Sequence, residues 1–160
     1  MITLERALRH LAWADDRLFA ELAGLPPEAL AARYAPDAWS VGALARHIVG
    51  GAEWYRYCLT GAEWTDLSDP GGREDLLALG AHLADLDAAL LAQASLPDGD
   101  VVFIDEDGPR TALRSTILTQ ACLHSTEHRA QIACALEVSG FGPLVLDDYD
   151  LWAFANVERS

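Results

Sequence analysis

The stretch REDLLALGAHLADLDAALLAQAS, residues 73–95, carries the clearest periodic pattern in this 160-residue sequence. Its leucines recur at alternating spacings of three and four residues: Leu76, Leu79, Leu83, Leu86 and Leu90. This spacing places all of them on one face of an α-helix, as in a helix that packs along the seam of a bundle. The stretch therefore predicts a helix over 73–95, with His82 off the seam and in solvent.

Three further segments have the length and the boundary signals of bundle helices. The first is predicted over 3–23, because Gly24 and the prolines that follow it end a helix. The second begins after Ser40, a favourable N-cap residue, and ends near Gly61. The last is predicted over 113–138, where another glycine follows shortly after.

Two shorter elements complete the pattern. Residues 101–104 and 111–113 flank an acidic turn and are predicted to pair as a small β-hairpin. The tail over 146–157 is predicted to form a short amphipathic helix. Because no linker or repeat divides the chain, we expect one domain over 1–160. Its fold class is all-α, an up-and-down four-helix bundle with a short hairpin between the third and fourth helices and a short C-terminal helix.

The composition narrows the classes of function. Hydrophobic residues make up 51% of the sequence, and the formal net charge is −14 at pH 7. Such a surface repels phosphate, so neither nucleic acid nor an anionic membrane is an expected partner. No apolar run reaches the ~18 residues of a membrane span, and the first residues do not have the pattern of a secretory signal. A cytoplasmic location is therefore expected.

The stretch HSTEH, residues 124–128, places two histidines one helical turn apart in the last predicted helix. Their face is otherwise small and apolar, with Ala121 and Ile132 as neighbours, so both imidazoles are expected to point inward. Two imidazoles at this spacing can bind one metal ion. The alternative is a pair of core or surface histidines without a metal.

A catalytic metal commonly has three protein ligands and one open position. His47 in the second predicted helix offers the third ligand, and it shares a face with Gly51 and Trp54. A glycine inside a helix costs about 1 kcal/mol relative to alanine, so room for a ligand or a close neighbouring helix would explain Gly51. The helical faces therefore predict a site made of His47, His124 and His128.

Asp15 continues the apolar face of the first predicted helix. A carboxylate that faces a core needs a partner. It can accept a hydrogen bond from a metal-binding imidazole, pair with an arginine, or lie at the edge of the bundle. The sequence leaves these three alternatives open.

The letters H-x-x-E-H also match the inverted zinc peptidases. Such an enzyme requires a further glutamate ligand on a later helix and Glu127 as the general base. Downstream, Glu137 lies far along the same helix and Glu158 lies in the tail. Apart from the small hairpin, no sheet is predicted that could hold an extended peptide, so we interpret the pattern as another kind of metal site.

Motifs spread over most of the chain resemble those of the DinB / YfiT-like superfamily of four-helix metalloproteins. The letters WAD at 13–15 resemble its W-A-N, and WSVGALARH at 39–47 resembles its W-[ST]-x-x-x-x-x-x-H. HSTEHRAQI at 124–132 resembles its H-x-x-x-H-x-x-Q-[IL]. The resemblance implies a metal site of the same three histidines, completed by water, with Asp15 where the superfamily usually has asparagine.

Characterised members of this superfamily include transferases and isomerases that use thiols such as bacillithiol and mycothiol. The resemblance implies a metal ion and a low-molecular-weight thiol whose pKa the ion lowers. Three imidazoles suit zinc, nickel and copper, and iron also stays open; we expect one divalent ion, zinc or nickel. The thiolate would attack an electrophilic small-molecule substrate. Glu127 is a candidate general base, although an ion pair with an arginine such as Arg46 is the simpler interpretation. Further residues expected around the site are Asp15, Gln131, Gly51 and Trp54.

Two other functions stay open. One is a stress-associated metal-binding bundle that catalyses no reaction and acts through a protein partner. The other is a hydrolase in which the metal activates water. Members of the superfamily are often homodimers, so a homodimer is expected, with Trp54, Trp64 or Trp152 either in its interface or in the core.

Overall fold

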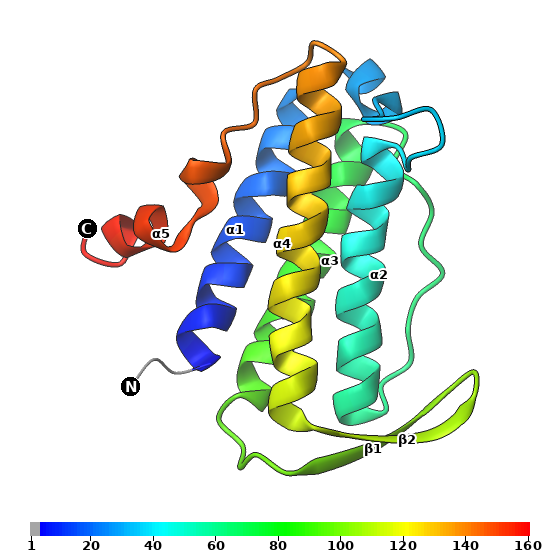
Figure 1. Cartoon of the computed structure of the whole chain (residues 1–160), viewed down its shortest axis with the longest axis vertical. Helices are drawn as coiled ribbons and strands as arrows, with labels where there is room; N and C mark the ends of the chain where they lie inside the picture. The colour runs from blue at the N-terminus through cyan, green and yellow to red at the C-terminus, as the bar shows by residue number, and fades with distance from the viewer. Residues whose placement is uncertain (1–3) are drawn as a thin grey trace.

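Four long helices lie side by side in the computed structural model, which describes residues 4–160 (Figure 1). They are α1 (Leu4–Gly24), α2 (Val41–Thr60), α3 (Arg73–Gln93) and α4 (Arg114–Val138). The predicted four-helix bundle is thus confirmed, with boundaries close to the expected ones; the predicted start at Thr3 lies outside the described residues. Ser40 caps α2 as predicted, because its hydroxyl accepts a hydrogen bond from the Ala43 N–H at 3.2 Å.

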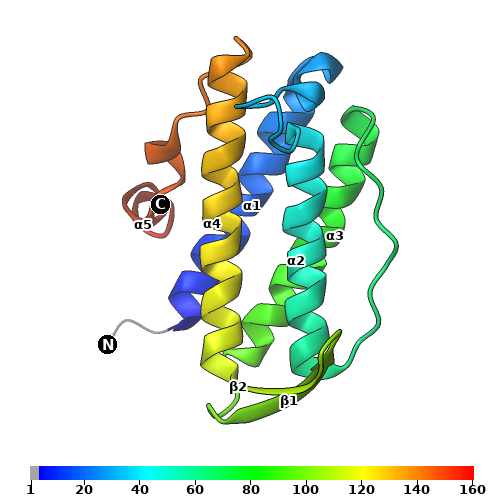
Figure 2. The same ribbon diagram turned by 45° about the vertical axis from the view of Figure 1, so that its right-hand side comes forward.

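The order of helix directions differs from the prediction. After α2 ends, segment 61–72 returns along the outside of the bundle, so α2 and α3 run in the same direction (Figures 1 and 2). A fully extended segment of this length reaches about 40 Å, more than the roughly 30 Å of a 20-residue helix such as α2. The up-and-down order is therefore wrong, because this connection is long enough to cross the whole bundle.

A buried carboxylate holds the crossing segment in place. Glu53 on α2 is 2% exposed and accepts hydrogen bonds from the backbone N–H and the hydroxyl of Thr65, at 3.1 and 2.7 Å. Its other contact is His82 Nε2 on α3, at 2.7 Å. Burial raises the pKa of Glu53, but the hydrogen bonds from His82 and Thr65 prevail and hold that pKa below its usual range. The prediction that His82 is in solvent is wrong, since it is half-buried beside the crossing segment.

The smaller elements lie at the ends and the side of the bundle. Strands β1 (Asp100–Asp105) and β2 (Gly108–Leu113) form the predicted antiparallel hairpin across one end of α2 and α4 (Figure 1). The tail forms a short 3-10 helix, η2 (Leu146–Tyr149), and a short α-helix, α5 (Leu151–Val157), beside α1. Another 3-10 helix, η1 (Pro27–Ala31), precedes α2. Within residues 4–160, no helix has the length and apolar character needed to span a membrane.

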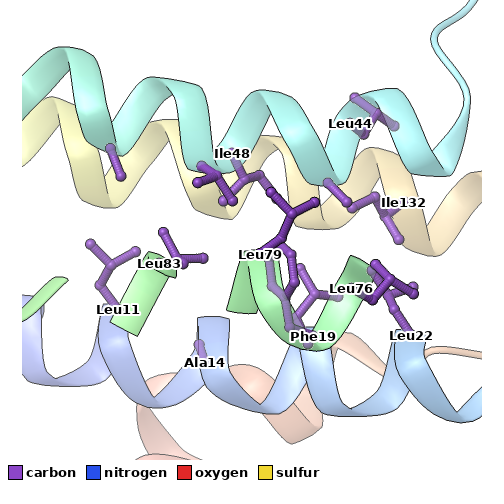
Figure 3. Close-up of a cluster of buried hydrophobic side chains, with 14 of the residues drawn as sticks. Leu11, Ala14, Phe19, Leu22, Leu44, Ile48, Leu76, Leu79, Leu83 and Ile132 are labelled. Carbon is purple, nitrogen blue, oxygen red and sulfur yellow. The ribbon is translucent and has the colours of Figure 1, made fainter. Parts of the chain in front are cut away.

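The predicted leucine seam of α3 forms much of the core (Figure 3). Leu76, Leu83 and Leu86 are at most 2% exposed, and fully burying one leucine contributes about 1.5–3 kcal/mol. Around them, α1, α2 and α4 contribute the partners Leu11, Phe19, Leu22, Leu44, Ile48 and Ile132. This apolar packing does not involve the histidines. It therefore holds α2 and α4 side by side without the need for a bound metal.

Candidate metal centre

Three histidines from α2 and α4 converge between these helices. The Nε2 atom of His124 lies 3.0 Å from Nε2 of His47 and 3.2 Å from Nε2 of His128. Nitrogens bound to one tetrahedral ion at about 2.0–2.1 Å lie about 3.3 Å apart, so the three imidazoles fit a single ion. Their ligand atoms all lie within 4.8 Å of one another, and each side chain is half-buried. The group can therefore hold a metal ion.

Gly51 makes the room that His124 occupies. A Cβ atom at position 51 would lie 2.4 Å from Cε1 and 2.7 Å from Nδ1 of His124. No ordinary Cβ contact is that short, so only glycine permits this close approach of the imidazole to α2. The unusual glycine inside the helix is thus explained by a histidine on the neighbouring helix, one of the two reasons expected from the sequence.

Gln131 and Trp39 support the histidines from the side. Oε1 of Gln131 lies 2.7 Å from Nδ1 of His128, which leaves Nε2 of that imidazole to face the other two. The Trp39 ring lies 4.6 Å from the His47 ring and 6.3 Å from the His128 ring, centroid to centroid, and is 51% exposed. Trp39 thus covers one side of the site, a role that its motif did not reveal.

The environment of His47 and His124 favours the neutral form of both imidazoles. Burial, together with the neighbouring His128 and His47, lowers the pKa of His124 to about 4. Burial also lowers the pKa of His47, with further contributions from His128 and Arg46. A neutral imidazole is the form that binds a metal, so the environment favours binding without competition from protons near pH 7.

Behind the histidines lies a buried polar cluster of Asp15, Ser125, Arg129 and Asp87. Asp15 accepts a short hydrogen bond from the Ser125 hydroxyl and pairs with Nη1 of Arg129 at 3.2 Å. Of the three alternatives for Asp15, the structure thus has the arginine pair. Arg129 and Asp87 were not anticipated from the sequence, although Asp87 lies on the seam between Leu83 and Leu90.

The two aspartates of this cluster differ in charge near pH 7. Burial raises the pKa of Asp15 to about 6, although Ser125 and Arg129 act in the opposite direction. Burial, and then the nearby charge of Asp15, raises the pKa of Asp87 to about 8. Asp15 is therefore mostly ionised and Asp87 mostly protonated, because two carboxylates this close do not both ionise readily.

We expect Asp87→Asn to become more stable relative to the wild type as pH rises. An aspartate has a pKa near 3.9 when unfolded, so between about pH 4 and 8 the folded wild type retains a proton that the unfolded chain has lost. Over this range the free energy of unfolding of the wild type falls by up to about 1.4 kcal/mol per pH unit. The Asp87→Asn variant has no proton to lose at this position, so its stability does not show this fall. Urea unfolding at pH 5 and pH 8 measures the difference in free energy of unfolding between the variant and the wild type. If this difference were the same at both pH values, Asp87 would not be protonated in the folded protein as stated above.

Two other predicted residues lie apart from the three imidazoles. Glu127 is exposed, and among residues 4–160 it has no ion-pair partner; the suggested pair with Arg46 does not form, since Arg46 pairs with Asp69. Trp54 packs against the rings of Tyr57 and Trp64 at centroid distances of 5.5 and 5.8 Å. Within residues 4–160, neither Glu127 nor Trp54 forms a hydrogen bond with any of the three imidazoles.

Two open hollows adjoin the site. The larger, the Trp64 hollow, has about 610 Å³ and is lined by Arg46, Gly50, Glu53, Trp54 and Trp64. The smaller, the Trp39 hollow, has about 310 Å³ and is lined by Tyr34, Trp39, His128 and Gln131 among others. Only the smaller includes one of the three histidines, so it is the more relevant one for a ligand that reaches the metal centre.

The sequence of this chain matches a known protein family over nearly its whole length. The model of the DinB family matches residues 1–157. The chain belongs to the DinB family. The match spans α1 to α4 and all three converging histidines, so it confirms the resemblance that the motifs indicated. Among curated proteins, none matches this DinB chain.

Proposed function

We propose that this DinB protein is a metal-dependent enzyme that transfers a low-molecular-weight thiol to an electrophilic small molecule. The observation that carries the proposal is the convergence of His47, His124 and His128 beside an open hollow. A divalent ion, zinc or nickel, supplies Lewis acidity there and favours the deprotonated form of a thiol. Three imidazoles leave a tetrahedral ion one position for such a ligand.

The residues of the chain supply binding and orientation. The three imidazoles would hold the ion, Gln131 fixes the ring of His128, and Gly51 leaves room for His124. The Trp39 hollow offers an aromatic wall for the apolar part of the electrophile, adjacent to His128. In the transfer, a carbon–sulfur bond forms, the bond to the leaving group breaks, and the thiol proton passes to solvent.

One observation favours a second function, a metal-binding bundle that acts through a protein partner. Trp152 is 82% exposed on α5, and large exposed aromatics are common at protein interfaces. The same residue, with the half-exposed Trp64, also supports the expected homodimer. Sedimentation of the wild type and of Trp152→Ala distinguishes a self-association surface from one that binds another protein.

The proposed function is tested first by elemental analysis of untagged protein. We expect about one zinc or nickel ion per chain, and none in the double variant His124→Ala/His128→Ala. Metal in both proteins, or in neither after incubation with zinc and nickel, would contradict the three-histidine centre.

The loaded protein is then assayed with bacillithiol, mycothiol and cysteine against an activated aryl chloride. Thiol loss that requires the histidines supports the transferase. Metal binding without turnover favours the partner-binding bundle, and ester cleavage without a thiol favours the hydrolase.

A further inference from the structure

A small polar cavity lies at the centre of the bundle, behind His124. All four long helices contribute aliphatic side chains to it, and its polar lining comes from Asp15, Tyr55, Asp87, His124 and Ser125. The space open to the centre of a water molecule is about 10 Å³, roughly what a single water requires. The cavity is therefore of the size and polarity that bind one water.

Two polar groups at this cavity need a hydrogen-bond partner. Oδ1 of Asp87 is buried and has none among residues 4–160. Nε2 of His124 faces the other two imidazoles, so Nδ1 is its remaining nitrogen, and none of the described residues forms a hydrogen bond with it. A buried polar atom without a partner costs about 1–3 kcal/mol, which favours a bound water at Oδ1 of Asp87, in a cavity that His124 also lines.

We propose that one water in this cavity joins the metal centre to Asp87. It accepts a hydrogen bond from Nδ1–H of His124 and donates one to Oδ1 of Asp87. When Nε2 of His124 binds a metal, its ring proton resides on Nδ1, and metal-binding imidazoles generally donate that proton to an outer acceptor. Asp87 is thus a positioning residue that fixes the tautomer and ring orientation of His124 without touching the ion.

The neighbouring groups support this choice of acceptor. His128 already has a direct acceptor in Gln131, at 2.7 Å, whereas the exposed Glu127, which follows His124 at the same spacing, forms no hydrogen bond with it. Asp15 already accepts hydrogen bonds from Ser125 and Arg129, and within residues 4–160 Asp87, not Asp15, has a buried oxygen without a partner. Oδ1 of Asp87 accepts a hydrogen bond whether or not the other oxygen of that carboxyl carries a proton, so the link does not depend on its ionisation.

The test compares zinc affinity in three variants by competition with a chromophoric chelator. Asp87→Leu removes the acceptor, and we expect about 10- to 100-fold weaker zinc binding. Asp87→Asn keeps an oxygen at this position, and we expect affinity within about threefold of the wild type, by the same reasoning. Asp85→Leu, an exposed position on the same helix, is the matched control and is expected to bind as the wild type does.

A second readout follows the ring proton itself. In cobalt-loaded wild type, the Nδ1 proton of His124 should give a shifted, slowly exchanging NMR resonance, which Asp87→Leu should lose and Asp87→Asn should keep. A merely structural role for Asp87 predicts that the resonance and the metal affinity stay unchanged in both variants, because replacing a buried unpaired carboxyl by leucine affects only the stability of the fold.

A high-resolution crystal structure of the wild type gives the direct test, with or without metal. We expect one water within hydrogen-bond distance of both Asp87 Oδ1 and His124 Nδ1. Its absence, or an Asp87→Leu variant with unchanged zinc affinity and an unchanged resonance, would overturn the inference. The inference rests on the proposed metal centre but not on thiol transfer: a protein that binds zinc through this water and transfers no thiol refutes only the proposed reaction.

Discussion

Gly51→Ala is expected to weaken zinc or nickel binding by about 100-fold or more while leaving the helical fold intact. The added methyl would lie 2.4 Å from Cε1 of His124, so the imidazole must rotate away from His47 and His128. The ring is the end of a side chain, and its movement costs the fold little. Alanine is also the better helix former by about 1 kcal/mol, so the metal-free variant should be at least as stable as the wild type.

Chelator competition measures the affinity, and thermal unfolding in excess chelator measures the stability of the metal-free protein. Gly50→Ala is the matched control, because a Cβ there meets nothing within 4 Å. It should gain the same helix propensity and keep wild-type metal binding. His124→Ala sets the level expected for complete loss of this ligand. A Gly51→Ala protein with wild-type affinity would show that His124 does not bind the metal in this position.

Arg129→Leu is expected to lower the free energy of unfolding by about 3–5 kcal/mol at pH 7, because it leaves the Asp15 carboxylate buried without its cation. Asp15 is 1% exposed and Arg129 is 3% exposed, so water cannot replace the lost partner. Without the arginine the pKa of Asp15 rises above its present value of about 6, so the folded variant retains a proton that the unfolded chain loses near pH 4. The loss of stability should therefore be smaller at pH 5 than at pH 7.

Urea unfolding at both pH values tests this expectation. The double variant Asp15→Asn/Arg129→Leu removes the charge as well and should recover much of the lost stability. Arg9→Leu breaks an exposed ion pair with Glu5 and should change stability by less than about 1 kcal/mol. If Arg129→Leu lowered the free energy of unfolding no more than Arg9→Leu does, the buried pair would contribute no more to stability than an exposed pair.

The helices and the three histidines could be predicted because each rests on local, periodic information. Leucine spacing in α3 defines one buried face, and the face of α4 that carries His124 and His128 follows from the same geometry. His47 could be predicted as a site residue because Gly51 follows it by one helical turn, and glycine is unfavourable inside a helix. Such signals need no knowledge of how the helices are connected in space.

The remaining features depend on how the helices are arranged. The crossing segment 61–72 has no periodicity, so its path, and with it the position of His82 beside Glu53, could not be derived from the sequence. Arg129 follows Ser125 by one helical turn, and Asp87 lies on the leucine seam between Leu83 and Leu90, yet charged residues at such positions are ordinarily assigned to the surface. Only the packing of α1 against α3 and α4 shows that they are buried together.

The candidate metal ligands His47 and His124 are 77 residues apart in the chain and lie on different helices. An ion bound there acts as a reversible cross-link that closes a long loop, and the unfolded chain holds no such preformed site. Binding energy thus adds directly to folding energy, by about 2.7 kcal/mol when the free ion is at one hundred times its dissociation constant. The melting temperature of this protein should therefore rise with metal concentration and serve as a measure of metal occupancy in any variant.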